Sequence, residues 1–145
     1  MKIGISACLL GCKYRYDGSD RKNEELLKLL EDHELIPVCP EYVSGFPIPH
    51  EPIELRNGRA FMKNENDVND QLLKGSMTCL EKISDCDLLI LKSKSPSCGY
   101  KKIYDGSFSG KLIDGNGMFT DLCLKSSIRI FSDTDIRSIK EYISR

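Results

Sequence analysis

Hydrophobic residues along the chain alternate between short continuous runs and helical spacings. Four apolar runs have the length and composition of buried strands: residues 2–7, 35–38, 86–91 and 128–132. Four other segments repeat apolar side chains every three or four residues, which predicts helices: residues 21–33, 65–84, 119–127 and 134–145. Because strand and helix alternate, the pattern predicts an α/β fold, an open parallel sheet of about four strands with helices on both faces.

Two segments interrupt this alternation. Residues 42–64 carry three prolines and two glycines and form the longest stretch expected to be irregular. A compact domain keeps such a stretch mainly for function. Residues 105–117 are rich in glycine and are also expected to lie outside regular structure.

Length, charge and the N-terminal segment narrow the possible locations and partners. A chain of 145 residues fits a single domain, residues 1–145. The net charge of −1, with Lys and Arg spread along the chain, argues against broad binding to nucleic acid. No apolar stretch approaches the ~18 residues that cross a bilayer, and the N-terminus lacks the features of a signal peptide. We therefore expect a cytoplasmic protein with no membrane partner.

Three of the seven cysteines fall where strands end. Cys8 follows the first predicted strand, Cys39 ends the second, and Cys98 lies in the loop after the third. The carboxyl ends of parallel strands line one crevice, so these thiols are expected to converge. Three thiolates suit a soft metal or an iron–sulfur cluster, and leave one position open for substrate.

The other cysteines carry less information. Cys79, Cys86 and Cys123 lie within apolar periodic segments, where packing in the core is the usual role of a thiol. Cys12 is ambiguous between a loop thiol and an extra ligand. An odd count in a reducing compartment argues against disulfides. The absence of any Cys-x-x-Cys pair argues against a zinc ribbon or a thioredoxin-type motif.

The chain resembles the thiouracil desulfidases over essentially its whole length. The resemblance rests on SACLLG (6–11), YRYDG (14–18), PVCPE (37–41), KSKSPSCG (92–99), YDGSFSGKL (104–112) and the later stretch at 115–133. It implies a Rossmann-like fold with a [4Fe–4S] cluster held by Cys8, Cys39 and Cys98, and with one iron not ligated by protein. It also implies that the iron–sulfur assembly machinery matures the protein.

The same resemblance implies a reaction and its substrates. A thiolated pyrimidine such as 4-thiouracil, as base, nucleoside or nucleotide, is converted to the oxo form with release of sulfide and without net electron transfer. Some family members carry extra domains that direct them to thiolated RNA. This chain shows no such extension, so a small molecule is expected rather than nucleic acid.

Several residues near the cysteines are candidates for catalysis and substrate binding. Glu41, two residues after Cys39, is the candidate general base, although a solvated or strand-capping carboxylate is the common alternative. The hydroxyl of either Ser95 or Ser97 can orient the substrate or pass a proton. The family resemblance favours Ser95 for catalysis, and Ser97 is a candidate for binding substrate. Serines in such a turn also hydrogen-bond its backbone. Arg15 and Lys94 are candidates for binding a phosphate, where an isolated Lys is more commonly a surface charge.

Aromatic and histidine residues near these segments are weaker candidates. Tyr14, Tyr16 and Phe46 can stack on a pyrimidine ring, although packing is the usual role of a single aromatic side chain. His33 and His50 are expected to be structural or solvent-facing.

Three other functions fit parts of the pattern. A zinc-dependent hydrolase can use the same three cysteines and a water, but the His-x-Glu and Cys-x-x-Cys pattern of zinc deaminases is absent. A non-catalytic iron–sulfur sensor normally needs a partner or DNA surface, and no basic recognition helix is visible. A metal-free nucleotide-binding module is unsupported, because no G-x-G-x-x-G motif follows the first strand.

Overall fold

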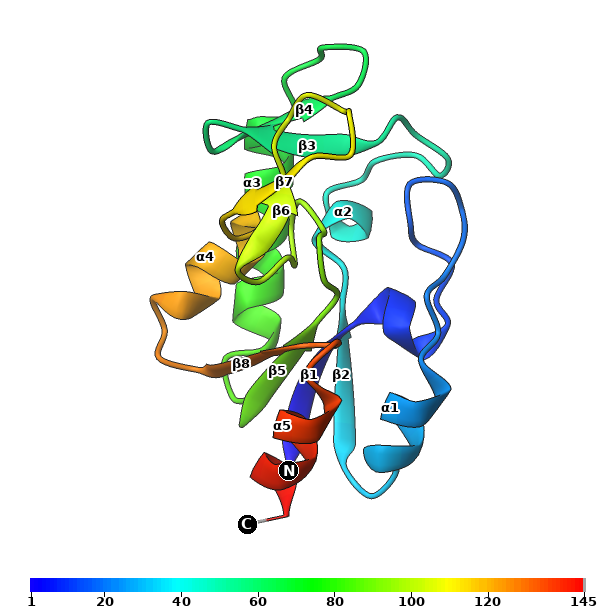
Figure 1. Ribbon diagram of the computed structural model, residues 1–145, viewed down its shortest axis with the longest axis vertical. Coiled ribbons are helices and arrows are strands. Elements are labelled where there is room, and N and C mark those ends of the chain that lie inside the picture. Colours follow the sequence, from blue (N-terminus) through cyan, green and yellow to red (C-terminus); the bar gives the residue numbers. More distant parts are fainter. Residues whose placement is uncertain (145) are drawn as a thin grey trace.

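The computed structural model describes residues 1–144, and its centre is a parallel sheet of four strands (Figure 1). The strands are β1 (Lys2–Ser6), β2 (Glu34–Val38), β5 (Leu88–Leu91) and β8 (Arg129–Ser132). They are arranged in the order β2-β1-β5-β8, and every neighbouring pair is parallel. The predicted α/β fold with an open parallel sheet is therefore confirmed.

Helices cover both faces of this sheet (Figure 1). On one face, α1 (Glu24–Leu29) and α5 (Ile136–Ile143) pack against Leu88 and Ile90 of β5. On the other face, α3 (Asn69–Lys82) and α4 (Met118–Leu124) pack against Leu89 and Leu91. Successive strand residues point to opposite faces, so a strand covered on both sides is apolar throughout. That is why the run LLIL is uninterrupted.

The helices are shorter than the sequence pattern predicts, and at the start of two of them a polar side chain binds a backbone N–H group inside the predicted range. Asn23 accepts a hydrogen bond from the backbone N–H of Leu26, so α1 begins at Glu24 rather than at residue 21. The Asp67 carboxylate accepts one from Asn69 N–H at the start of α3, whose predicted range began at residue 65. Residue 145, at the end of the last predicted helix, lies outside the described residues.

Two antiparallel hairpins lie beyond the carboxyl ends of the sheet. The first pairs β3 (Ile53–Arg56) with β4 (Arg59–Met62), and the second pairs β6 (Lys102–Tyr104) with β7 (Leu112–Asp114). All of their strands except β6 fall in the segments 42–64 and 105–117, which the sequence predicts to be irregular. A small separate core joins them to α3, made by Phe46, Ile53, Leu55, Ala60, Leu72 and Ile103. The hairpins, together with the short helix α2 (Pro40–Val43), therefore stand over the end of the sheet where the cysteines lie (Figure 1).

The chain reverses its direction across the sheet between β1 and β5. From β1 it passes to β2 on one side, and then returns to β5 on the other side of β1. Ligands of open α/β sheets bind in the crevice that such a switch leaves at the carboxyl ends of the strands. Among the described residues, no helix is both long and apolar enough to cross a membrane.

Candidate functional site

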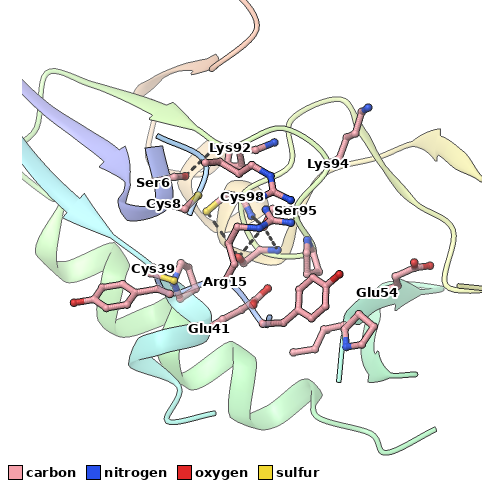
Figure 2. Close-up of a pocket in the computed structure, with 18 of the residues that line it drawn as sticks. Ser6, Cys8, Arg15, Cys39, Glu41, Glu54, Lys92, Lys94, Ser95 and Cys98 are labelled. Atoms are coloured by element: carbon pink, nitrogen blue, oxygen red, sulfur yellow. Dashed lines mark hydrogen bonds between the residues drawn. The ribbon is translucent and has the colours of Figure 1, made fainter. Parts of the chain in front are cut away.

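A cavity of about 540 Å³ opens at the carboxyl ends of β1, β2 and β5 (Figure 2). Cys8 lies in the 3-10 helix η1 (Ala7–Leu10) that follows β1, and Cys39 caps the N-terminus of α2 directly after β2. Cys98 lies in the loop after β5. All three cysteines line the cavity, although 90 residues separate the first from the last. We call these three cysteines the thiol triad.

Burial makes the thiol triad reluctant to ionise in the absence of a cation. It raises the pKa of Cys39 to about 12 and the pKa of Cys8 above its usual range. Burial also raises the pKa of Cys98, a shift opposed by hydrogen bonds from the hydroxyls of Ser6 and Ser97. A bound metal supplies the positive charge that stabilises buried thiolates. The donor chemistry of the cavity therefore suits a thiophilic metal group.

The spacing of the donors bears on the size of that group. No three His, Cys, Asp or Glu side chains within residues 1–144 are grouped closely enough to hold a single metal ion. The thiol triad instead surrounds part of a cavity large enough for a group of several atoms. Soft thiolates arranged in this way fit an iron–sulfur cluster.

Ser95 and Ser97 form a hydroxyl chain that ends on the Cys98 thiol. The Ser95 hydroxyl oxygen accepts hydrogen bonds from the backbone N–H of Ser97 (3.2 Å) and of Cys98 (3.0 Å). The two hydroxyl oxygens lie 3.1 Å apart, and Ser97 Oγ donates to Cys98 Sγ at 3.8 Å. Both lone pairs of Ser95 Oγ are occupied, so its remaining capacity is to donate its hydrogen. Ser97 is buried and its hydroxyl is committed to its neighbours.

Glu41 lies in the first turn of α2 and lines the same cavity (Figure 2). Its side chain is 15% exposed, and burial raises its pKa to about 7, opposed by the nearby charge of Arg15. The carboxyl group is thus neither solvated nor committed to a strand cap, the two common roles of a carboxylate at such a position.

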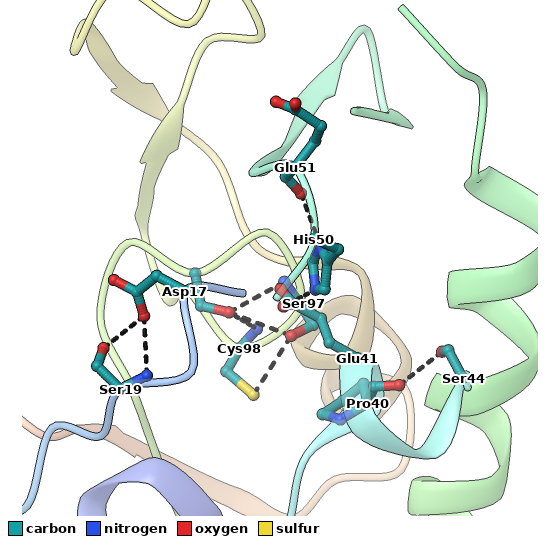
Figure 3. A network of polar contacts seen from close by, with 10 residues as sticks. Asp17, Ser19, Pro40, Glu41, Ser44, His50, Glu51, Ser97 and Cys98 are labelled. Atoms are coloured by element: carbon teal, nitrogen blue, oxygen red, sulfur yellow. Dashed lines mark hydrogen bonds and ion pairs between the residues drawn. The ribbon is translucent and has the colours of Figure 1, made fainter. Parts of the chain in front are cut away.

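His50 faces Glu41 from the segment between α2 and β3, and its role was not anticipated (Figure 3). Its Nε2 lies 3.7 Å from Glu41 Oε2, and its side chain is only 3% exposed. Its Nδ1 lies 2.6 Å from the carbonyl oxygen of Glu51, which can only accept, so Nδ1 carries a hydrogen. The ring is therefore fixed with Nε2 directed at the Glu41 carboxyl. His50 is not solvent-facing, and no local sequence signal distinguishes it.

Positive charge predominates around the cavity. Its charged lining comprises five cations and two carboxylates: Arg15, Arg21, Lys63, Lys92, Lys94, Glu41 and Glu54. Within the described part of the chain, Arg15 Nε is buried and has no hydrogen-bond partner. Lys92 Nζ donates to the carbonyl and hydroxyl oxygens of Ser93, and burial lowers its pKa. The cavity can thus take a ligand that carries an anionic group.

The remaining cysteine, aromatic and histidine candidates either lie outside the cavity or, for Tyr14 and Tyr16, line it. Cys79 and Cys123 are buried in the core, Cys86 is half-buried beside it, and Cys12 is half-buried and does not line the cavity. Tyr14 and Tyr16 line the cavity, but the Tyr14 ring already stacks on Tyr42, with centroids 3.9 Å apart. Phe46 is packed in the core of the hairpins. His33 lies away from the cavity, with Nδ1 3.1 Å from the N-terminal nitrogen.

Comparisons with known proteins match nearly the whole chain. A family model described as 2-thiouracil desulfurase matches residues 3–135. The chain is 33% identical over 149 aligned positions to the uncharacterized protein YbbK of Bacillus subtilis (strain 168), covering 94% of this chain and 99% of that one. Its fold is similar to that of the [4Fe-4S]-dependent thiouracil desulfidase TudS, with a TM-score of 0.90 and 31% identity over 99% of this chain and 97% of that chain.

Proposed function

The chain belongs to the 2-thiouracil desulfurase family, and we propose that it converts 4-thiouracil or a related thiolated pyrimidine to the oxo form with release of sulfide. The observation that carries this proposal is the convergence of the thiol triad on a cavity that also holds a buried carboxyl group. The reaction exchanges sulfur for the oxygen of water, so no electron donor is needed.

The proposed cofactor is a [4Fe–4S] cluster held by Cys8, Cys39 and Cys98, with one iron not ligated by protein. The three thiols line one cavity and are soft donors, and among residues 1–144 no fourth cysteine lines it. When bound, the cluster supplies a Lewis-acidic iron toward the sulfur of the thiocarbonyl group.

Glu41 is proposed as the general base. Its carboxyl lines the cavity beside the thiol triad, where it can accept a proton from the water that adds to the sulfur-bearing ring carbon. His50 Nε2, 3.7 Å away, gives the carboxyl a fixed neighbour and so limits its orientations. Both residues are held by the short segment from α2 to β3.

Ser95 is proposed as a hydrogen-bond donor to the substrate. Two backbone N–H groups occupy its lone pairs, so toward a ligand it can only donate. Without a ligand, the acceptor for that hydrogen is the hydroxyl oxygen of Ser97, which lies 3.1 Å from Ser95 Oγ. The sequence makes Ser97 a candidate for binding substrate. Its burial supports an indirect contribution, through Ser95 and Cys98.

Arg15 and Lys94 are proposed to bind an anionic part of the substrate. Both line the cavity, and the buried Arg15 Nε has an unused hydrogen. A guanidinium with a free N–H is suited to a phosphate oxygen. The excess of cations favours a thiopyrimidine nucleotide over the neutral base or nucleoside.

We also propose that residues 1–145 form one domain of this kind, that the enzyme is cytoplasmic, and that it acts on a small molecule rather than on nucleic acid. A net charge of −1 supports the last point, because nonspecific binding to nucleic acid needs a positive surface. Loading of the cluster is assigned to the iron–sulfur assembly machinery.

The test begins with iron and acid-labile sulfide in protein purified or reconstituted without oxygen, followed by turnover of 4-thiouracil. About four of each per chain, with uracil and sulfide formed in equal amounts, is the expected result. A full cluster without turnover of the base or its nucleotide would favour the sensor. Zinc near one per chain without labile sulfide would favour the hydrolase.

A further inference from the structure

The wall of the cavity that faces the thiol triad is built by the two hairpins, outside the parallel sheet. Glu54 of β3 and Phe108 of the loop between β6 and β7 both line the cavity. Figure 2 shows Glu54 across the cavity from Cys8. A substrate whose sulfur faces the thiols therefore has the hairpins on its other side.

Phe108 adopts an unusual backbone conformation at this wall. Its φ of +57° is in the left-handed region, which is rare for a bulky residue that is not glycine. Such conformations persist only where surrounding contacts enforce them, and they concentrate at functional sites. Phe108 is half-exposed and belongs to none of the three hydrophobic cores of the described residues.

Glu54 supplies the contacts that enforce this conformation. One carboxylate oxygen, Oε1, accepts hydrogen bonds from the backbone N–H of Gly106 and of Phe108, both at 3.1 Å. Hydrogen bonds to an ionised acceptor are stronger than those between neutral groups. A single side chain on β3 therefore fixes the loop on both sides of Ser107.

Arg56 fixes the same loop by donating hydrogen bonds to the backbone carbonyl group of Gly106. Its Nε and Nη2 donate to the carbonyl oxygen of Gly106 at 3.2 and 2.9 Å. Glu65 holds the guanidinium in place, accepting from Nη1 at 2.9 Å. A Cβ on Gly106 would lie 2.7 Å from Arg56 Cβ, so the two backbones approach too closely for any other residue.

Strand geometry explains why two residues of β3 act together. Side chains two positions apart share one face of a strand, so Glu54 and Arg56 both point at the loop. Leu55 between them points the opposite way and is buried in the small core with Ile103 of β6. The core thus fixes the spacing of the two hairpins, and the polar pair fixes the loop.

The Phe108 ring lines the cavity and has no aromatic or cationic partner among the described residues. By contrast, Tyr14 is stacked on Tyr42, and the Arg15 guanidinium lies over the Tyr16 ring. Stacking on an aromatic side chain suits any pyrimidine, because the contact uses the face of the ring.

We propose that Phe108 positions the pyrimidine ring of the substrate by stacking, and that Glu54 and Arg56 are positioning residues that act through the loop. This proposal rests on the proposed function, because the ring that would stack on Phe108 is the pyrimidine of the proposed substrate. Phe108 contributes binding rather than chemistry, so its loss should raise KM and leave kcat unchanged.

The test uses the cluster-loaded enzyme with uracil, the expected product, as the binding probe. Phe108→Gly removes the ring and also relieves the left-handed backbone, so its melting temperature should stay close to that of the wild type. Phe108→Leu keeps an apolar side chain without the flat ring. Glu54→Ala frees the loop. Glu51→Ala, an exposed carboxylate three residues away that does not contact the loop, is the control.

We expect Phe108→Gly and Glu54→Ala each to weaken uracil binding about tenfold, or about 1.4 kcal/mol, with a smaller loss in Phe108→Leu. KM for 4-thiouracil should rise in parallel, with kcat within about twofold and iron content unchanged. In Glu54→Ala the amides of Gly106 and Phe108 should exchange hydrogen at least about tenfold faster. Glu51→Ala should change none of these quantities.

Two results would overturn the proposal. One is uracil affinity unchanged in both Phe108 variants. The other is unchanged exchange of the two amides in Glu54→Ala. A wild-type enzyme that binds uracil through Phe108 but does not desulfurise thiopyrimidines would instead refute the proposed reaction and leave the binding role of the wall intact.

Discussion

Replacing Glu41 by glutamine should slow the proposed reaction and at the same time stabilise the cluster-free protein. Glutamine has nearly the same shape but cannot take a proton from water at neutral pH. Loss of a general base typically lowers kcat by about 10²–10⁴. Glu41 is not one of the thiols, so iron and labile sulfide should remain at wild-type levels.

The gain in stability follows from the burial of the carboxyl group. Burial raises its pKa from 4.5 to about 7, with Arg15 opposing the shift. As pH rises above 4.5, the unfolded chain releases this proton while the folded protein retains it. The wild type therefore loses stability relative to the variant across this window, and the difference levels off above about pH 7. A shift of this size corresponds to about 3 kcal/mol.

Thermal unfolding of the cluster-free proteins measures this difference. At pH 8 we expect Glu41→Gln to melt roughly 10 °C above the wild type, and at pH 4 the two should melt together. Glu51→Gln, which changes an exposed carboxylate nearby, should match the wild type at both values.

Two outcomes would contradict this reasoning separately. Melting temperatures that differ by the same amount at pH 4 and pH 8 would mean that the Glu41 carboxylate is hydrated in the folded protein. Turnover near the wild-type rate with an intact cluster would remove Glu41 from the role of base, whatever its effect on stability.

Three further predictions concern the thiol triad, His50 and the packing of α2 against α3. Alanine at any member of the thiol triad should abolish the cluster. Cys79→Ala, in the core, should keep the cluster at a cost of about 1 kcal/mol in unfolding free energy. Equal iron content in all four variants would refute the ligand assignment. His50→Leu should lower kcat about tenfold with normal iron and KM, and an unchanged kcat would show that His50 does not position Glu41. In urea unfolding, Gly75→Ala should lose about 1–3 kcal/mol, because its Cβ would clash with the Ser44 hydroxyl and lie 2.6 Å from the Pro40 carbonyl oxygen. Unchanged stability would mean that α2 can move away from α3.

The sheet and the meeting of the cysteines could be predicted because each depends on a strong, simple pattern. Strands buried on both faces are apolar throughout, as in Leu88–Leu91, and such runs are visible in any sequence. Once the strands are placed, the rule that parallel strands end on one edge puts Cys8, Cys39 and Cys98 together without knowledge of side-chain contacts.

The hairpins could not be predicted because their strands are short and lie in or beside segments rich in proline and glycine. All three residues of β7 are exposed, and β3 is only four residues long, within a segment rich in proline. His50 was missed for another reason. Its burial comes from Phe46 and Tyr16, which are neighbours in space and offer no periodic signal. The same holds for Glu54, whose partners are 52 and 54 residues away.

The division of the cavity between sheet and hairpins has an evolutionary consequence. The thiols belong to loops at the ends of core strands, where insertions or deletions would disturb the whole fold. The hairpins are excursions with their own small core, so their loop lengths and side chains can vary while the thiol triad stays in place. Relatives can therefore diverge in substrate preference by accumulating changes in residues 53–63 and 102–114. The same two segments are the places to diversify in a library aimed at new thiocarbonyl compounds.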